Sequence, residues 1–310
     1  MAGISNPSFS TKVLGIVAGS CTMWGALNLQ TVPSKVIEKL HDKTGKLTDE
    51  EKTRVWQAVD KMNKDSGLEA KGLKYLICRS KEDLKSDEFK KFKEKYFDEP
   101  EEKLKKEMQA EDTSFFKKCW LGLKRIYLKT ERELSKETVK QTVNGKNACF
   151  EEETNTIIIN PDKRSGSVFH EAGHAMNNDK KPWYTKLARI FNTLTIIAAT
   201  GLIAKVGLMK TKKAPGEEIK GFIDGATDFV KNHAGKIAFA LWIPRLIEEF
   251  TATTNGYKYA KENLPEKTSK KILISNLVAF MTYVTSALTT AGAVTLGIFA
   301  KDAIARRFIK

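Results

Sequence analysis

The sequence predicts an α+β protein that is mainly helical, with a small β-sheet next to one particular helix and additional apolar helices. Three observations lead to this fold class. The pattern HExxH occupies His170–His174 within an uninterrupted helical stretch. Short apolar runs rich in β-branched residues precede that motif. Long blocks without a charged residue lie at both ends of the chain and after the motif.

Composition restricts the classes of partner. The chain has 310 residues, and 53 Lys and Arg against 38 Asp and Glu give a net charge of +15. The lysines are interleaved with glutamates, so we expect a solvated surface and no nucleic-acid partner. Four distant cysteines without a CxxC pair indicate neither a disulfide framework nor a cysteine zinc site. They are Cys21, Cys78, Cys119 and Cys149.

Residues 1–30 form the first expected segment. Val13–Leu29 contains no charge and has no clear cleavage site. We therefore predict a retained membrane anchor, with a signal segment or a buried helix as the alternatives.

Residues 31–78 are expected to supply a helix and a strand of the main domain. Thr48 and Glu51 have the spacing of a capping box at a helix start. The apolar run Leu73–Cys78 is typical of a strand. Residues 79–140 then read as a charged helical insertion, whose helices are divided at Pro100 and whose aromatic stripe we expect in a core.

Residues 141–265 hold the central motif and its upstream strands. Asn144-Gly145 is a turn signal, and two strands are expected after it, near Asn147–Phe150 and at Thr156–Asn160. The second strand can bind a peptide by strand addition, or it can be an ordinary strand of the sheet. Its residues are Thr156, Ile157, Ile158, Ile159 and Asn160.

Apolar blocks follow the motif. An apolar hairpin is expected within 187–247, and residues 266–310 read as an apolar helix with a basic tail. Ile272–Ala300 is long enough to cross a bilayer with tilt. We therefore predict an integral membrane protein in contact with lipid. Lysines and arginines flank both ends of the blocks, so the side of the membrane stays open.

The HExxH pattern indicates zinc chemistry. His170 and His174 lie on the same face of a helix, where both imidazoles can reach one ion. Glu171 can take a proton from water held at that ion. Glycine and histidine at the spacing of a metzincin are absent, because Asn177 and Lys180 occupy those positions.

A catalytic zinc ion needs a third protein ligand. The best candidates are the adjacent Glu248 and Glu249, which are costly to place at the end of an apolar block unless they are paired or bind a cation. Alternatively, Arg245 and Lys258 simply pair with these acids. Asp224, Asp228 and His233 are weaker candidates.

HExxH followed by Glu249-Phe250-x-Ala252 resembles the integral-membrane gluzincin metallopeptidases of the HtpX and CAAX-prenyl-protease type. The resemblance implies a gluzincin-like catalytic domain and one Zn²⁺ per chain. It implies His170, His174 and Glu249 as ligands, with Glu248 as the second choice, and Glu171 as the general base.

Two of the departures from the family pattern concern the site itself. Thr253 stands where the family has an aspartate that supports a ligand histidine. The family's C-terminal histidine, which stabilises the transition state, has no match, and Tyr257 or Tyr259 is the hypothesis for that role.

The resulting hypothesis is a membrane-bound zinc endopeptidase that hydrolyses a protein or peptide through a metal-activated water. A non-catalytic membrane or scaffold protein with a structural or degenerate zinc site is the alternative. A third interpretation is a basic protein that binds lipid or nucleic-acid surfaces.

Overall fold

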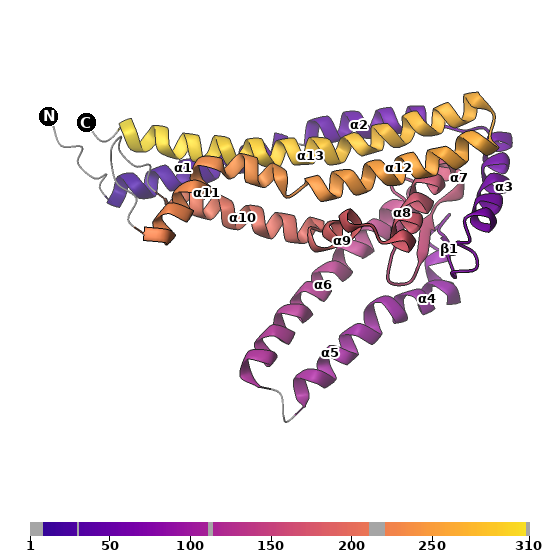
Figure 1. Cartoon of the computed structure of the whole chain (residues 1–310), viewed down its shortest axis with the longest axis horizontal. Coiled ribbons are helices and arrows are strands. Elements are labelled where there is room, and N and C mark those ends of the chain that lie inside the picture. The colour runs from indigo at the N-terminus through magenta and orange to yellow at the C-terminus, as the bar shows by residue number, and fades with distance from the viewer. Residues whose placement is uncertain (1–8, 30, 111–113, 211–220, 308–310) are drawn as a thin grey trace. The chain divides into compact units, whose positions relative to one another are not determined.

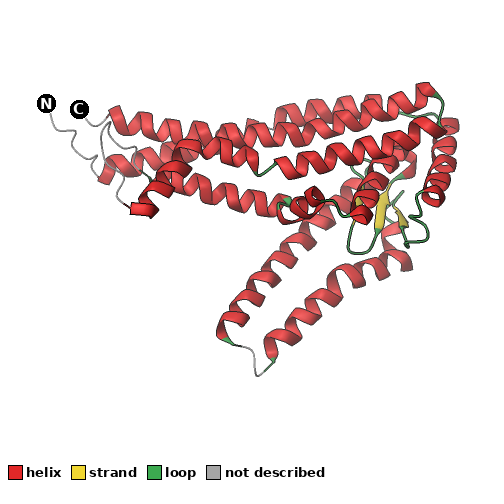
Figure 2. Ribbon diagram, viewed as in Figure 1, coloured by secondary structure: helices red, strands yellow, loops and turns green. Residues whose placement is uncertain are grey.

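The chain folds into helices and one small sheet, as a computed structural model that describes residues 9–29, 31–110, 114–210 and 221–307 shows (Figure 2). The prediction of a mainly helical α+β protein is confirmed at this level. In chain order the elements are α1 (Phe9–Leu29), α2 (Thr31–Thr44), α3 (Asp49–Asp65), β1 (Lys74–Ile77), the 3₁₀ turn η1 (Asp83–Lys85), α4 (Asp87–Lys93), the π-helical turn η2 (Glu94–Asp98), α5 (Glu99–Gln109), α6 (Phe115–Val143), β2 (Cys149–Glu151), β3 (Thr156–Ile159), α7 (Pro161–Arg164), the 3₁₀ turn η3 (Ser165–Ser167), α8 (Val168–Lys180), α9 (Trp183–Ile190), α10 (Thr193–Met209), α11 (Gly221–Ala240), α12 (Ile243–Asn263) and α13 (Glu266–Arg307) (Figure 1).

The chain divides into two compact units. One, called here the sheet unit, consists of His41–Lys181 and Thr251–Leu277. The other, the apolar unit, consists of Met1–Leu40, Pro182–Phe250 and Val278–Lys310. Helix α12 passes from one unit to the other without a break, and the boundary falls directly after Phe250.

The sheet has the strand order β1-β3-β2, with β1 parallel and β2 antiparallel to β3. All four residues of β3 are buried, and Thr156, Ile157 and Ile158 are paired on both sides. The prediction that Thr156–Asn160 receives a peptide is therefore wrong, because this strand has no free edge along most of its length. The strand is an ordinary central strand, and the edges belong to β1 and β2.

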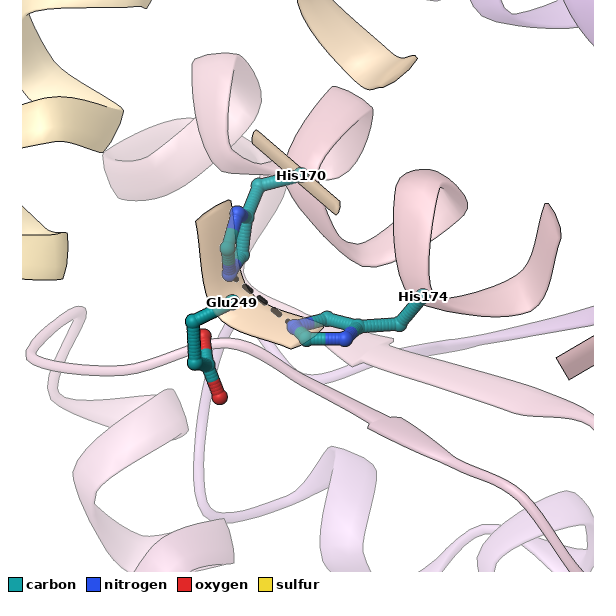
Figure 3. Close-up of side chains that lie close together, drawn as sticks. All are labelled: His170, His174 and Glu249. Atoms are coloured by element: carbon teal, nitrogen blue, oxygen red, sulfur yellow. Dashed lines mark hydrogen bonds between the residues drawn. The ribbon is translucent and has the colours of Figure 1, made fainter. Parts of the chain in front are cut away.

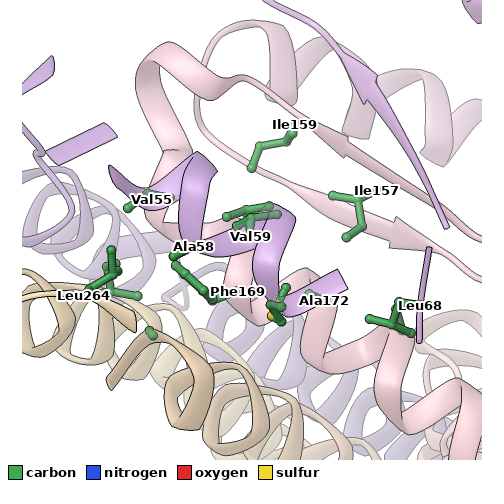
Figure 4. Close-up of a cluster of buried hydrophobic side chains, with 14 of the residues drawn as sticks. Val55, Ala58, Val59, Leu68, Ile157, Ile159, Phe169, Ala172 and Leu264 are labelled. Carbon is green, nitrogen blue, oxygen red and sulfur yellow. The ribbon is translucent and has the colours of Figure 1, made fainter. Parts of the chain in front are cut away.

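The core of the sheet unit forms between α3, the sheet and α8 (Figure 4). Helix α3 begins at the predicted capping box, in which Thr48 and Glu51 each bond the other's backbone N–H. Val55, Val59 and Met62 then recur at helical spacing and are fully buried. This packing holds the HExxH helix against the sheet.

The aromatic stripe within 79–140 divides between two environments. Phe92 and Phe97 are buried, as expected of core residues. Phe115, Phe116 and Trp120 on α6 are exposed, so the prediction that the stripe lies in a core is wrong for this helix. The sequence period places these residues on one face, and no described element covers that face.

The apolar unit contains the uncharged blocks as helices. Helices α10 and α11 pack against each other, and Ala204, Ala238 and Val294 belong to one buried cluster. Among the described residues, two helical stretches are long and apolar enough to cross a membrane, Thr11–Thr44 and Glu266–Ile304. The first runs through residue 30, which lies outside the described part. Helices α9 and α10, bent by 62°, qualify only as a pair.

Candidate metal centre

Helix α8 presents both histidines of the HExxH pattern on one face. The Nε2 atoms of His170 and His174 lie 3.0 Å apart, and the two rings meet edge to face. In Figure 3 these nitrogen atoms point toward the same small volume, beside the carboxylate of Glu249 (Figure 3). One turn of helix separates the two residues, which explains why their side chains converge.

Glu249 completes a three-residue group. One ligand atom from each of His170, His174 and Glu249 lies within 4.8 Å of the other two, and this is the one such group found in the described ranges. A tetrahedral zinc ion with bonds of about 2.1 Å separates its ligand atoms by about 3.4 Å. A small movement of the carboxylate therefore suffices to satisfy that geometry. Glu249 is fully buried, which is costly for a carboxylate without a cation.

Two glycines let α12 approach α8. A Cβ atom on Gly173 would lie 2.0 Å from the carbonyl oxygen of Ala252, and one on Gly256 would lie 1.9 Å from that of Phe169. Real Cβ contacts are never this short. Glycine at both positions is therefore required for the helix spacing that brings Glu249, near the start of α12, toward the histidines.

Thr253 contacts the first histidine directly. Its Oγ1 lies 3.0 Å from Nδ1 of His170, and the side chain is fully buried. When the hydroxyl accepts from Nδ1–H, the lone pair of His170 is on Nε2, the atom that faces His174. Thr253 thus contacts the ring nitrogen of His170 that faces away from the ligand group, as a group that supports a metal-binding histidine would.

A second polar contact joins the same two helices. The Nδ2 of Asn177 donates to Oγ1 of Thr251 at 3.0 Å, and the Nδ2 of Asn255 donates to Oδ1 of Asn177 at 2.8 Å. Sequence reasoning missed this pair of bonds. The signal was present, because Asn177 lies seven residues after His170 and so on the same face of α8.

Arg245 provides a cation to the acidic pair. Its Nη2 lies 2.5 Å from Oε1 of Glu249, one turn along α12, and its Nη1 lies 3.8 Å from Oε2 of Glu248. Glu249 therefore lies both in an ion pair with Arg245 and in the metal-ligand group, whereas no ion pair of Lys258 is found among the described residues. Glu248, the second choice, is not in that group.

The chain has no match among protein-family models, curated proteins or solved structures. What the site does is therefore inferred from its own residues. Glu171 is buried beside the histidines on α8. Burial and the carboxylate of Glu171 raise the pKa of the Cys149 thiol, which indicates that β2 runs close to this glutamate.

The other predicted site residues lie in different surroundings. Tyr257 and Tyr259 pack against the core cluster of the sheet unit, and their assignment as stabilisers of a transition state stays a prediction. The weaker ligand candidates are engaged within the apolar unit: Asp224 pairs with Lys210, and Asp228 accepts from Asn232. The ring of His233 stacks on Phe229.

Proposed function

We propose that the chain is a zinc-dependent endopeptidase of gluzincin type, acting at a membrane. The observation that carries the proposal is the convergence of His170, His174 and Glu249, with Glu171 buried on the same helix. Two imidazoles and one carboxylate are the ligand set of many catalytic zinc sites, and they leave one position for water. When bound, zinc supplies a water of lowered pKa and polarises the carbonyl of the substrate.

The protein residues have separable roles in this proposal. Thr253 orients His170 so that Nε2 is available as a ligand atom. Glu171 accepts the proton of the attacking water and then donates it to the leaving amine. Its side chain is buried on α8, the helix that also carries both histidines.

In this proposal the substrate pairs with β2, and not with the central strand β3 that the sequence had indicated. The outer edge of β2 is free of a described strand, and this strand lies against α8. An extended peptide that pairs with Cys149–Glu151 would run along the helix that carries Glu171. Membrane attachment through Glu266–Ile304 would restrict the substrates to chains that come near a bilayer.

A second candidate is favoured by the Arg245–Glu249 ion pair. Arg245 compensates the buried carboxylate without any metal ion, so the group can also serve as a structural contact between turns of α12. In that case the chain is a non-catalytic membrane or scaffold protein.

Metal analysis combined with hydrolysis of an unfolded protein such as casein separates the candidates. We expect about one zinc per parent chain and loss of zinc in His174→Ala and Glu249→Ala. Glu171→Gln should keep zinc and lose about 10²–10⁴-fold in rate. Asp179→Asn is the matched control, since this acid lies on the same helix and pairs with Lys71 at its surface.

Two results would overturn the peptidase proposal. One is a parent chain that binds zinc in none of these assays. The other is a Glu171→Gln variant that cleaves casein at the parental rate. A parent that holds zinc and cleaves no unfolded substrate supports a structural zinc site in a non-catalytic protein, and a parent without zinc supports the Arg245–Glu249 contact alone.

A further inference from the structure

The N-terminal half of α6 has an exposed apolar face. The six large apolar side chains of this face, named below, fall within an arc of about 140° when successive residues are placed about 100° apart around the helix axis. Phe115 is 75% exposed, Phe116 84% and Ile126 64%. The apolar residues of the face are Phe115, Phe116, Trp120, Leu123, Ile126 and Tyr127. So large a cluster of exposed aromatic rings marks an interaction surface.

The opposite face of α6 is covered by α5. Leu121 is 2% exposed, and Arg132 bonds Glu101 of α5 at 3.2 Å. Arg125 approaches the same glutamate at 3.5 Å. The ends of α5 and α6 next to residues 110–114 lie farthest from the sheet within the sheet unit (Figure 1). The hairpin therefore turns its apolar face away from its own partner helix.

Charge on this half of the helix has one sign. Phe115–Thr130 contains five basic residues and no acidic residue. Lys117 and Lys124 border the apolar arc on one edge, and Lys118 and Lys129 border it on the other. The Nζ of Lys124 also lies 5.7 Å from the ring of Trp120. Beyond Thr130 the helix carries both acids and bases, so the stretch without an acid coincides with the half of α6 that carries the exposed aromatic rings.

We propose that the apolar face of α6 inserts into the headgroup region of an anionic lipid bilayer. Aromatic rings flanked by lysines are the composition of helices that lie in this region, where the lysines contact lipid phosphates and the rings enter the acyl boundary. A nucleic acid would use the cations and leave Leu123 and Ile126 in water. An acidic protein would need an apolar groove matched to this face in addition to its charge, whereas a bilayer supplies both the acyl boundary and the phosphates.

This inference depends on α6 alone and holds whether or not the metal group is catalytic. It gives the chain a second contact with the bilayer besides its apolar helices. The cations and rings would hold the α5–α6 hairpin flat on a surface rich in negative lipid.

A fluorescent label at Cys119 tests the proposal in the full chain. Cys119 is exposed within the arc, and Cys21→Ser removes the other exposed thiol. Cys78 is buried, and Cys149 lies inside the sheet unit with a thiol of raised pKa, so Cys119 reacts first. The labelled chain is placed in lipid nanodiscs of phosphatidylcholine, with or without about 30% phosphatidylglycerol. Quenching by nitroxide lipids reports insertion.

We expect strong quenching in anionic discs and weak quenching in neutral discs or at high salt. Each neutralised lysine should lower the ratio of inserted to free hairpin about fivefold, so Lys117→Gln with Lys118→Gln should lower it about 25-fold. Lys136→Gln with Lys140→Gln is the matched control on the same helix, beyond the arc, and should change nothing.

Three outcomes would overturn the proposal. The label stays in water in anionic discs, or neutral and anionic discs quench it equally, or it is protected only when single-stranded RNA or an acidic protein is added. A label at Lys140→Cys, with Cys119→Ser, should remain in water throughout and shows that the reporter itself does not drive insertion.

Discussion

The contact between Thr253 and His170 offers a sharp test of the metal centre. Thr253→Val keeps the shape of a fully buried side chain and removes the hydroxyl that lies 3.0 Å from Nδ1. Loss of a hydrogen-bond partner at a buried group costs about 1–3 kcal/mol. Removal of a group that orients a metal ligand typically lowers metal affinity about 10–100-fold. We expect a loss of zinc affinity within that range, with the fold intact.

Competition with a fluorescent zinc chelator measures the affinity, and circular dichroism monitors the fold. Thr254→Val is the matched control, because this neighbouring hydroxyl bonds only the backbone oxygen of Thr251 in its own helix. The control should bind zinc like the parent. If Thr253→Val also binds zinc with parental affinity, Thr253 does not orient His170, and the account of the departure from the family pattern fails.

Three further predictions concern packing and charge. Gly173→Ala should lower the free energy of unfolding by about 2–3 kcal/mol, because its Cβ meets a backbone oxygen. Gly122→Ala, with open space around the added Cβ, should raise the free energy of unfolding by about 0.5–1 kcal/mol. Thermal melts of both variants and the parent measure the two changes. Burial raises the pKa of Glu151 from 4.5 to about 7, so its contribution to stability is full below pH 4.5 and is lost as the pH rises through 7. At pH 8 the Glu151→Gln variant should therefore be more stable than the parent by up to about 3 kcal/mol, which a thermal melt detects as a higher melting temperature. At pH 4.5 the variant and the parent should melt at the same temperature. Arg245→Met should destabilise the zinc-free chain by about 3 kcal/mol, because it leaves the buried carboxylate of Glu249 without its cation. It should destabilise the zinc-loaded chain by less. Equal losses of stability in the two states would argue against a metal at Glu249.

Local patterns predicted most of the elements, and non-local pairing explains where prediction failed. The capping box at Thr48 and the HExxH helix both depend on spacing within one element, and both are found in the structure. The position of β3 in the centre of the sheet depends on β1, which lies about eighty residues upstream. Periodicity along Thr156–Ile159 contains no information on how many neighbours that strand acquires. The same holds for α6. The helical period of its apolar residues reveals that they share a face, but it contains no information on which element covers that face.

The site was predictable to the extent that its residues share a helix. His170, Glu171 and His174 follow from one motif. The approach of Glu249 to the histidines depends on two further conditions, which cannot be read from a motif. One is the pair Gly173 and Gly256, which permits the helix contact. The other is a charge balance around a buried carboxylate.

That charge balance also accounts for the residue at position 253. An aspartate there would add a third buried carboxylate to α12, one turn from Glu249, and Arg245 already engages both Glu248 and Glu249. A threonine contacts Nδ1 of His170 through its hydroxyl without adding charge. Because Arg245 and Glu249 lie one turn apart on α12, their ion pair can form with the helix itself, before any ion is present. Arg245 thus compensates the carboxylate without a metal ion, and in the proposed zinc site zinc would compete with one arginine for one carboxylate.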